Sequence, residues 1–248
     1  MKNPKNSDDD LTLMSIMQRF STEESARNYF EILRWSNGPV CSHCGNCNQE
    51  RIYKVTANVG KKIRVGLYKC AECSDQFTVT LGTVMEDSHI LLNKWLIAFY
   101  IMCASKMQVS ALQLQRQLEL GSYRSALFLC HRIRFALKDV LPESKLGGTV
   151  EADETYIGGK KRGHGQGSVS KKTFVVSLGE RGGQVCSHVV DKLGTRHHTS
   201  KQHTGLYYAE LEFKYYTRSS TDGARTVDAK QGIAGKRLML RRSKAKGM

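Results

Sequence analysis

Apolar residues recur every three to four positions along much of the N-terminal half, the spacing of the buried face of an amphipathic helix. Ser21 is followed three residues later by Glu24, which is the spacing of a capping box, so the first helical stretch is expected to divide in two. Gly121 is expected to form the turn between the last two helices. The predicted helices cover residues 12–35, 88–105, 110–118 and 123–137.

Alternation of apolar and polar residues, typical of half-buried strands, marks two other regions. The first follows Asn37-Gly38-Pro39, a strong break in a helix, and the second follows a linker at 142–148. Two β-branched runs around a glycine turn at 180–183 predict a β-hairpin. Residues 206–216 fit either a helix or a strand, and 194–205 have no clear period. The predicted strands cover residues 53–57, 62–70, 76–82, 149–157, 173–178 and 184–190.

The charge of the chain indicates its class of partner. Its 248 residues carry a formal net charge of +15, which favours nucleic acid first and an anionic membrane surface second. The end of the chain, from Lys230 onward, is basic and has no acid, so we expect a solvated tail that contacts phosphates without sequence preference. No signal peptide and no transmembrane span is recognisable, which predicts a cytoplasmic protein.

Four cysteines have the spacing of a metal site. CSHC at 41–44 and CAEC at 70–73 form two CxxC turns, and two such turns can supply a tetrahedron of thiolates for zinc. Cys41, Cys44, Cys70 and Cys73 are the predicted ligands, which makes Cys47 and His43 surplus to a filled, structural site. The ribbon between the turns is rich in lysine, which fits either a DNA-contacting face or an ordinary soluble surface.

The two helices predicted at 110–118 and 123–137 have the order and spacing of a helix-turn-helix. Its second helix places residues near its start against base edges. The basic residues predicted to contact DNA from this helix are Arg124, Arg132 and Arg134. Helix pairs of this kind are equally common in plain helical packing, so the pair is either a DNA-binding helix-turn-helix or an ordinary pair of packed helices.

The strand predicted at 149–157 is acidic within a basic chain. Alternation places Glu151, Asp153 and Thr155 on one face. The alternatives are a solvent-exposed polar face or a site for Mg²⁺ or Mn²⁺, which prefer oxygen ligands. Phosphoryl-transfer enzymes often hold two such ions with carboxylates from separate elements. Asp153 is the first candidate ligand, and Asp222, expected near the end of a later strand, is the second, although Thr-Asp-Gly is often only a turn.

Several motifs together resemble one protein family, the bacterial insertion-sequence transposases that carry an N-terminal zinc ribbon ahead of an RNase H-like DDE catalytic domain. The resemblance runs, with gaps, from about residue 20 to residue 192. The matching stretches are CSHCG, YKCAECSDQFTVTLGTVMEDSHI, LNKWLIAFYIM, SALQLQRQLELGSYRSALFLCHRIRFAL, GGTVEADETYIGGKKRG and VVSLGERGGQVCSHVVD.

The resemblance implies a multidomain α+β fold, in which a zinc ribbon and a helical helix-turn-helix region precede a partial RNase H-like mixed α/β sheet. It implies that Asp153 is the first catalytic carboxylate and that Asp222 is the best match to the second. The implied organisation is an N-terminal helical segment at 1–36, the ribbon at 37–86, the helix-turn-helix region at 87–141, an incomplete catalytic domain at 147–229 and a basic tail at 230–248.

Two features depart from the family pattern. The family has an amphipathic helix after the hairpin, and the segment GTRHHTSKQHTG at that position does not resemble one. The family also has a third acidic metal ligand, usually Glu, whereas no Glu follows Glu212 in this chain. A truncated or frame-shifted copy is the expected explanation.

The leading hypothesis is therefore a DNA transposase that uses structural Zn²⁺ and catalytic Mg²⁺ or Mn²⁺. It would bind double-stranded DNA at element ends and at the target, as a homo-oligomer on DNA in the bacterial nucleoid, and cleave and join strands. The loop residues Lys160, Lys161 and Arg162 would add DNA contacts. The alternative is a catalytically inactive copy that acts only as a DNA-binding protein. A zinc-ribbon transcription factor is disfavoured, because it would not need the acidic strand.

Overall fold

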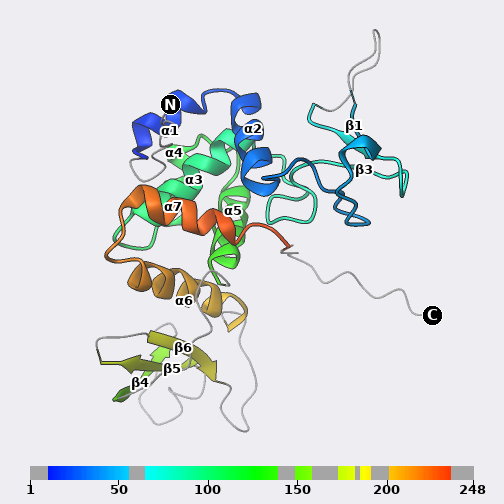
Figure 1. Cartoon of the computed structure of the whole chain (residues 1–248). Helices are drawn as coiled ribbons and strands as arrows, with labels where there is room; N and C mark the ends of the chain where they lie inside the picture. The colour runs from blue at the N-terminus through cyan, green and yellow to red at the C-terminus, as the bar shows by residue number, and fades with distance from the viewer. Residues whose placement is uncertain are drawn as a thin grey trace, which may run out of the picture.

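A computed structural model describes residues 11–55, 65–138, 149–157, 173–181, 185–190 and 201–235. Figure 1 shows a body of helices, a small ribbon that projects from one side of it, and a three-stranded sheet at another end, beneath α6. The described residues thus form a mixed α/β structure with two small antiparallel sheets, in the order β1-β2-β3 and β4-β5-β6. Of the basic tail predicted at 230–248, residues 236–248 lie outside the described residues.

The N-terminal stretch forms two helices, α1 (Leu13–Arg19) and α2 (Glu23–Arg34). The prediction of a division was right, but the cap at Ser21 was wrong. Thr22 caps α2 by accepting a hydrogen bond from the backbone N–H of Ser25 at 3.2 Å. Threonine at this position satisfies a backbone donor that the first turn of a helix leaves open.

Helix α3 (Leu92–Ala104) lies at the centre of the helical body. Its buried side chains include Trp95, Phe99 and Met102, each with no exposed surface. Leu91, at its N-cap position, makes no side-chain capping bond. The carboxylate of Glu23 at the start of α2 supplies this cap, because it accepts a hydrogen bond from the backbone N–H of Leu92 at 2.7 Å.

Helices α4 (Ala111–Gln117) and α5 (Tyr123–Leu137) follow α3, and α4 packs on α5. The predicted ranges are confirmed to within a residue or two. Helix α6 (Lys201–Tyr216) packs on α5, and α7 (Asp222–Gln231) packs on α3. A helix therefore does follow the sheet, contrary to the expectation drawn from the irregular sequence before residue 206; the segment at 191–200 lies outside the described residues.

The end of α7 belongs to the helical body, not to a tail that begins at residue 230. Lys230 is buried, and its ammonium donates to the Tyr29 hydroxyl of α2 at 2.6 Å. Ala234 then forms a β-bridge with Thr83, just after the ribbon. The predicted boundary between a catalytic domain and a basic tail is therefore wrong, because these residues pack against the first half of the chain.

The ribbon consists of a 3₁₀ turn, η2 (Gln49–Arg51), and three strands, β1 (Ile52–Lys54), β2 (Tyr68–Cys70) and β3 (Gln76–Phe77). The rings of Tyr68 and Phe77 both pack edge-on against Trp35 at the end of α2, with centroids 5.3 and 5.8 Å away. The prediction of a strand through residue 82 was too long, because the backbone turns after Thr78, whose carbonyl accepts from the N–H of Leu81.

The second sheet is formed by β4 (Val150–Ile157), β5 (Thr173–Glu180) and β6 (Val185–Val190). The predicted strands and hairpin are confirmed here. In the antiparallel register Asp153 lies opposite Ser177, which lies opposite Ser187 on β6. Directly opposed residues share a face of the sheet, so Asp153, Ser177 and Ser187 form a row across its three strands. The hydroxyls of the two serines are 3.0 Å apart.

Candidate functional site

The four predicted cysteines come together in the ribbon. Their sulfur atoms all lie within 4.8 Å of one another. The Cys41 and Cys73 sulfurs are 3.7 Å apart, as are those of Cys44 and Cys70. Zinc–sulfur bonds of about 2.3 Å in a tetrahedron would separate the sulfurs by about 3.8 Å. The donor set and its spacing therefore fit a zinc ion.

Both CxxC turns have the same local geometry, which aims two sulfurs at one point. The N–H of Cys41 donates to the Asn46 carbonyl at 2.9 Å, and the N–H of Cys70 donates to the Asp75 carbonyl at 3.0 Å. Each turn is followed by a residue in the left-handed region, Gly45 with φ of 75° and Ser74 with φ of 62°. Glycine adopts this conformation readily, whereas serine does so at some cost.

The environment of Cys70 favours its thiolate form, which is the form that binds zinc. The backbone N–H of Cys73 and the side-chain amide of Asn46 donate to its sulfur and hold the pKa of the thiol at about 6, although burial opposes this. Hydrogen bonds to the charged form lower a pKa in this way.

The surplus residues stay outside the cluster. His43 Nε2 contacts the Gln76 carbonyl at 3.2 Å, and Cys47 is exposed. With four protein ligands, zinc here would have no open coordination position, so it would stabilise the ribbon and not act on a substrate.

The α4–α5 pair presents a polar face. Arg124 is exposed at the second position of α5, and Ser122 caps that helix by accepting from the Ser125 N–H at 3.1 Å. The turn between the helices is set at Glu119, whose φ is 49°, and not at Gly121 as predicted. Lys94 of α3 fixes this turn, because its ammonium donates to the Leu118 carbonyl at 2.7 Å.

Arg132 and Arg134, in contrast, point into the protein. Arg132 is 5 % exposed and donates to the carbonyls of Val84 and Glu86 at 2.9 and 2.7 Å. Arg134 is 2 % exposed and forms an ion pair with Glu210 of α6 at 2.6 Å. Their burial corrects the prediction that they contact DNA, since neither guanidinium reaches the surface.

The polar residues of α4 were missed by the sequence analysis. Gln113, Arg116 and Gln117 are exposed beside the start of α5. Their spacing of three to four positions within a helix otherwise anchored by Leu114 would have identified them as the outward face. They and Arg124 are among the exposed polar residues of the pair, and we call these four residues the α4–α5 face.

Asp153 is exposed on β4, as are its neighbours Glu151 and Thr155. Glu151 forms an ion pair with Arg181, with 2.6 Å between the carboxylate and the guanidinium. Among the residues that the structure describes, the four cysteines are the only group of three or more metal-ligating side chains close enough to share an ion. The described part of the chain thus gives Asp153 no completed carboxylate site.

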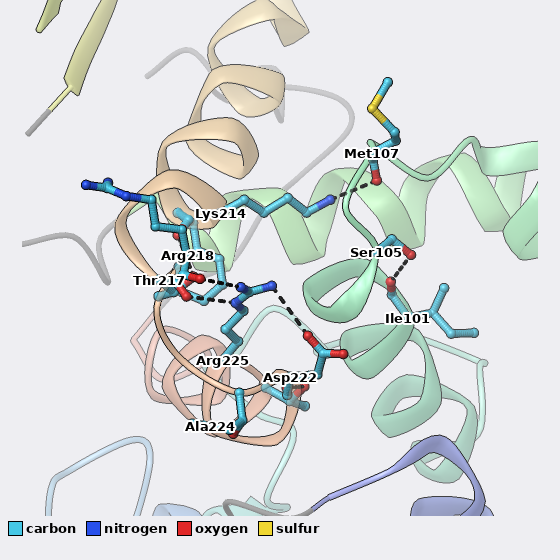
Figure 2. Close-up of polar contacts among 12 residues, drawn as sticks. Ile101, Ser105, Met107, Lys214, Thr217, Arg218, Asp222, Ala224 and Arg225 are labelled. Atoms are coloured by element: carbon cyan, nitrogen blue, oxygen red, sulfur yellow. Dashed lines mark hydrogen bonds and ion pairs between the residues drawn. The ribbon is translucent and has the colours of Figure 1, made fainter.

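Asp222 lies far from the position predicted for it. It is the first residue of α7, not the end of a strand, and its carboxylate contacts Arg225 at 3.4 Å. Figure 2 shows this pair beside Thr217 and Arg218. In Figure 1, α6 lies between α7 and the sheet that carries Asp153. The structure does not bring the two aspartates together, so these residues do not fit a shared magnesium ion.

The basic loop residues Lys160, Lys161 and Arg162 lie outside the described residues. None of the helices in the described ranges has the length and apolarity that crossing a bilayer requires.

Comparison with known proteins supports the ribbon assignment. Residues 21–76 match a family model described as "Transposase zinc-ribbon domain". The chain is 30% identical over 150 residues to an "Uncharacterized protein in transposable element ISH50" of Halobacterium salinarum. That alignment covers 58% of this chain and 45% of the relative, so the chain matches less than half of the relative's length. No solved structure matches the chain. The chain therefore contains a zinc-ribbon region similar to that of transposases.

Proposed function

We propose that this protein is a transposase of an insertion element that binds duplex DNA through the α4–α5 face and its zinc ribbon. The observation that carries the proposal is the four-cysteine cluster, which has zinc geometry inside a stretch that matches a transposase zinc ribbon. The net charge of +15 adds a preference for a polyanion.

The α4–α5 face has the chemistry for DNA recognition. Arg124 is placed at the start of α5, where a helix entering the major groove contacts base edges. Gln113 and Gln117 carry amides of the kind that pair with adenine, and Arg116 can contact phosphate. On the ribbon, Lys54 and Lys69 are exposed and add positive charge.

Binding can be tested with a short fluorescein-labelled duplex of random sequence, whose anisotropy is followed across a salt titration. We expect Arg116→Ala to weaken binding several-fold and to reduce the slope of log affinity against log salt by about one, the loss of one phosphate contact. Arg181→Ala, an exposed arginine on the sheet, is the matched control and should leave both quantities unchanged. Equal effects of the two variants would refute a specific α4–α5 face.

Strand cleavage is the finer part of the proposal, and Asp153 is the residue that we assign to it. The assay is nicking of supercoiled DNA that contains an element end, with Mn²⁺ or Mg²⁺ added. We expect Asp153→Asn to abolish nicking. Asp222→Asn is the informative partner, because its position on α7 predicts little effect.

The alternative is a protein that binds DNA without cutting it. The separation of Asp153 from Asp222 by α6 favours this alternative. Tight binding to duplex DNA with no metal-dependent nicking by the wild-type protein would establish it.

A further inference from the structure

Helix α6 contacts both the helical body and the sheet. It packs on α5 on one side and on β6 on the other, and Figure 1 shows it lying between them. Two carboxylates of α6, Glu210 and Glu212, make contacts on these two sides. Residues two positions apart on an α-helix are about 200° apart around its axis, so Glu210 and Glu212 are expected to face opposite ways.

The contacts agree with that expectation. Glu210 has no exposed surface and accepts from Arg134 of α5 at 2.6 Å and from Lys214 at 2.8 Å. The Glu212 carboxylate instead accepts from the backbone N–H of Ser187 on β6. An edge strand leaves some backbone groups without a strand partner, so this bond fastens the sheet to α6.

The same cluster holds the three residues that lead into α4. The Lys214 ammonium donates to the Met107 carbonyl at 3.0 Å, a contact visible in Figure 2. Arg134 Nη2 donates to the Val109 carbonyl at 3.2 Å. Between them, the Gln108 side chain donates to the backbone carbonyl of Tyr207 on α6 at 2.9 Å.

Glu210 is the anion on which this arrangement depends. It lies between two cations with side-chain exposures of 2 % and 9 %, those of Arg134 and Lys214. The guanidinium of Arg134 also stacks over the Tyr207 ring, 4.1 Å from its centroid. Removal of the carboxylate would leave a buried guanidinium and a partly buried ammonium without their counter-ion, and such groups move toward water when they can.

We propose that Glu210 is a positioning residue that fixes residues 107–109, and through them the α4–α5 face, on α6. Glu212 fixes the sheet to the opposite side of the same helix, so that DNA bound at α4–α5 and the strand bearing Asp153 keep one relative position. The coupling between the two sides rests on the proposed DNA-binding function, whereas the fixing of residues 107–109 does not.

Hydrogen exchange of the full-length protein, with and without the labelled random-sequence duplex, tests both parts. In free Glu210→Gln we expect faster exchange of the amides at 107–117, and an affinity for the duplex lowered about tenfold, within the usual range for coupled sites. In the wild type, added duplex should slow exchange of the Ser187 amide; in Glu212→Met, whose side chain has no acceptor oxygen, this protection should be lost while affinity is kept. Glu24→Gln, an exposed acid on α2, is the control and should behave like the wild type.

A second variant separates positioning from simple stability. Arg134→Met combined with Glu210→Gln removes the buried ion pair, and such double replacements often retain or regain stability. It lacks the Arg134 donor to the Val109 carbonyl, which Glu210 holds in place in the wild type, so we expect a melting temperature near the wild-type value with affinity still reduced. Restored affinity in this variant would show that Glu210 acts only through stability.

The outcomes also separate this inference from the proposed function. A wild-type protein that does not bind the duplex refutes the proposed function, and exchange at 107–109 in free Glu210→Gln then decides the role of Glu210 by itself. Wild-type exchange at 107–109 in that variant would overturn the inference whether or not DNA binds.

Discussion

The zinc ribbon and the acidic sheet differ in how their candidate ligands are spread along the chain. The ribbon takes two pairs of ligands from two local turns, 41–44 and 70–73, and those turns meet across a short antiparallel ribbon. The acidic site would need Asp153 and Asp222, which lie on elements with a helix between them. Ligands supplied as local pairs can be assigned from spacing alone, whereas ligands from separate elements depend on the packing of everything between them.

The strongest test of this difference removes the metal. We expect a chelator, or Cys44→Ser, to abolish zinc binding and unfold the ribbon, because structural zinc contributes about 10–16 kcal/mol of apparent binding free energy in small zinc modules. Hydrogen exchange should increase at β1–β3 and stay unchanged at β4–β6. Zinc content by atomic absorption and exchange by mass spectrometry provide the readouts. Cys47→Ser is the control and should retain the metal; equal loss of order in both sheets would remove the contrast.

A smaller change in the free energy of unfolding should distinguish a substitution in the helical body from one at the edge of the sheet. Phe99 is fully buried on α3, so Phe99→Ala should cost about 3–5 kcal/mol through the cavity that it leaves. Val150 on β4 is 42% exposed, so Val150→Ala should change stability by about 0.5 kcal/mol or less. Urea unfolding followed by circular dichroism measures both. A large cost at Val150 would mean that β4 is covered in solution.

The helix cap at Thr22 gives an intermediate effect. Thr22→Ala removes the acceptor for the Ser25 N–H and should destabilise the body by about 1 kcal/mol. Ser21→Ala is the matched control, since sequence spacing alone would have assigned the cap to that residue. A larger loss for Ser21 than for Thr22 in the same urea titrations would contradict the observed cap.

A comparably small effect to that of Val150→Ala is expected at the ion pair between Arg181 and Glu151. Both side chains are mostly exposed, at 75% and 64%. Solvent screening limits such a pair to about 0–1 kcal/mol. A double-mutant cycle with Arg181→Ala and Glu151→Ala, repeated at high salt, measures the coupling. A coupling well above this range would indicate that the sheet is shielded from solvent.

Sequence reasoning succeeded where local patterns determine structure. The ranges of α4 and α5 and the hairpin of β5 and β6 followed from periodicity and turn residues. It failed at Arg132 and Arg134, because basic residues on a helix give no indication of which face another helix will cover. The partner of Arg134 is Glu210, 76 positions later, on a stretch that fitted helix and strand equally well. Had that stretch been assigned as a helix, the Glu210–Lys214 spacing would have suggested a pair.

The bond from Glu23 to the start of α3 has a consequence for how the chain folds. The ribbon is an excursion that leaves from the end of α2 and returns at the start of α3, and this bond joins the start of α2 to the start of α3. The free energy of closing a loop depends weakly on its length, by roughly 0.6 kcal/mol for each doubling. When the ribbon is unfolded, the segment that connects α2 to α3 is a long loop, and when it is folded the same segment is a short connection. Loss of the metal therefore changes the entropy of closing the α2–α3 contact only slightly. We therefore expect the contact between Glu23 and the start of α3 to persist when zinc is removed.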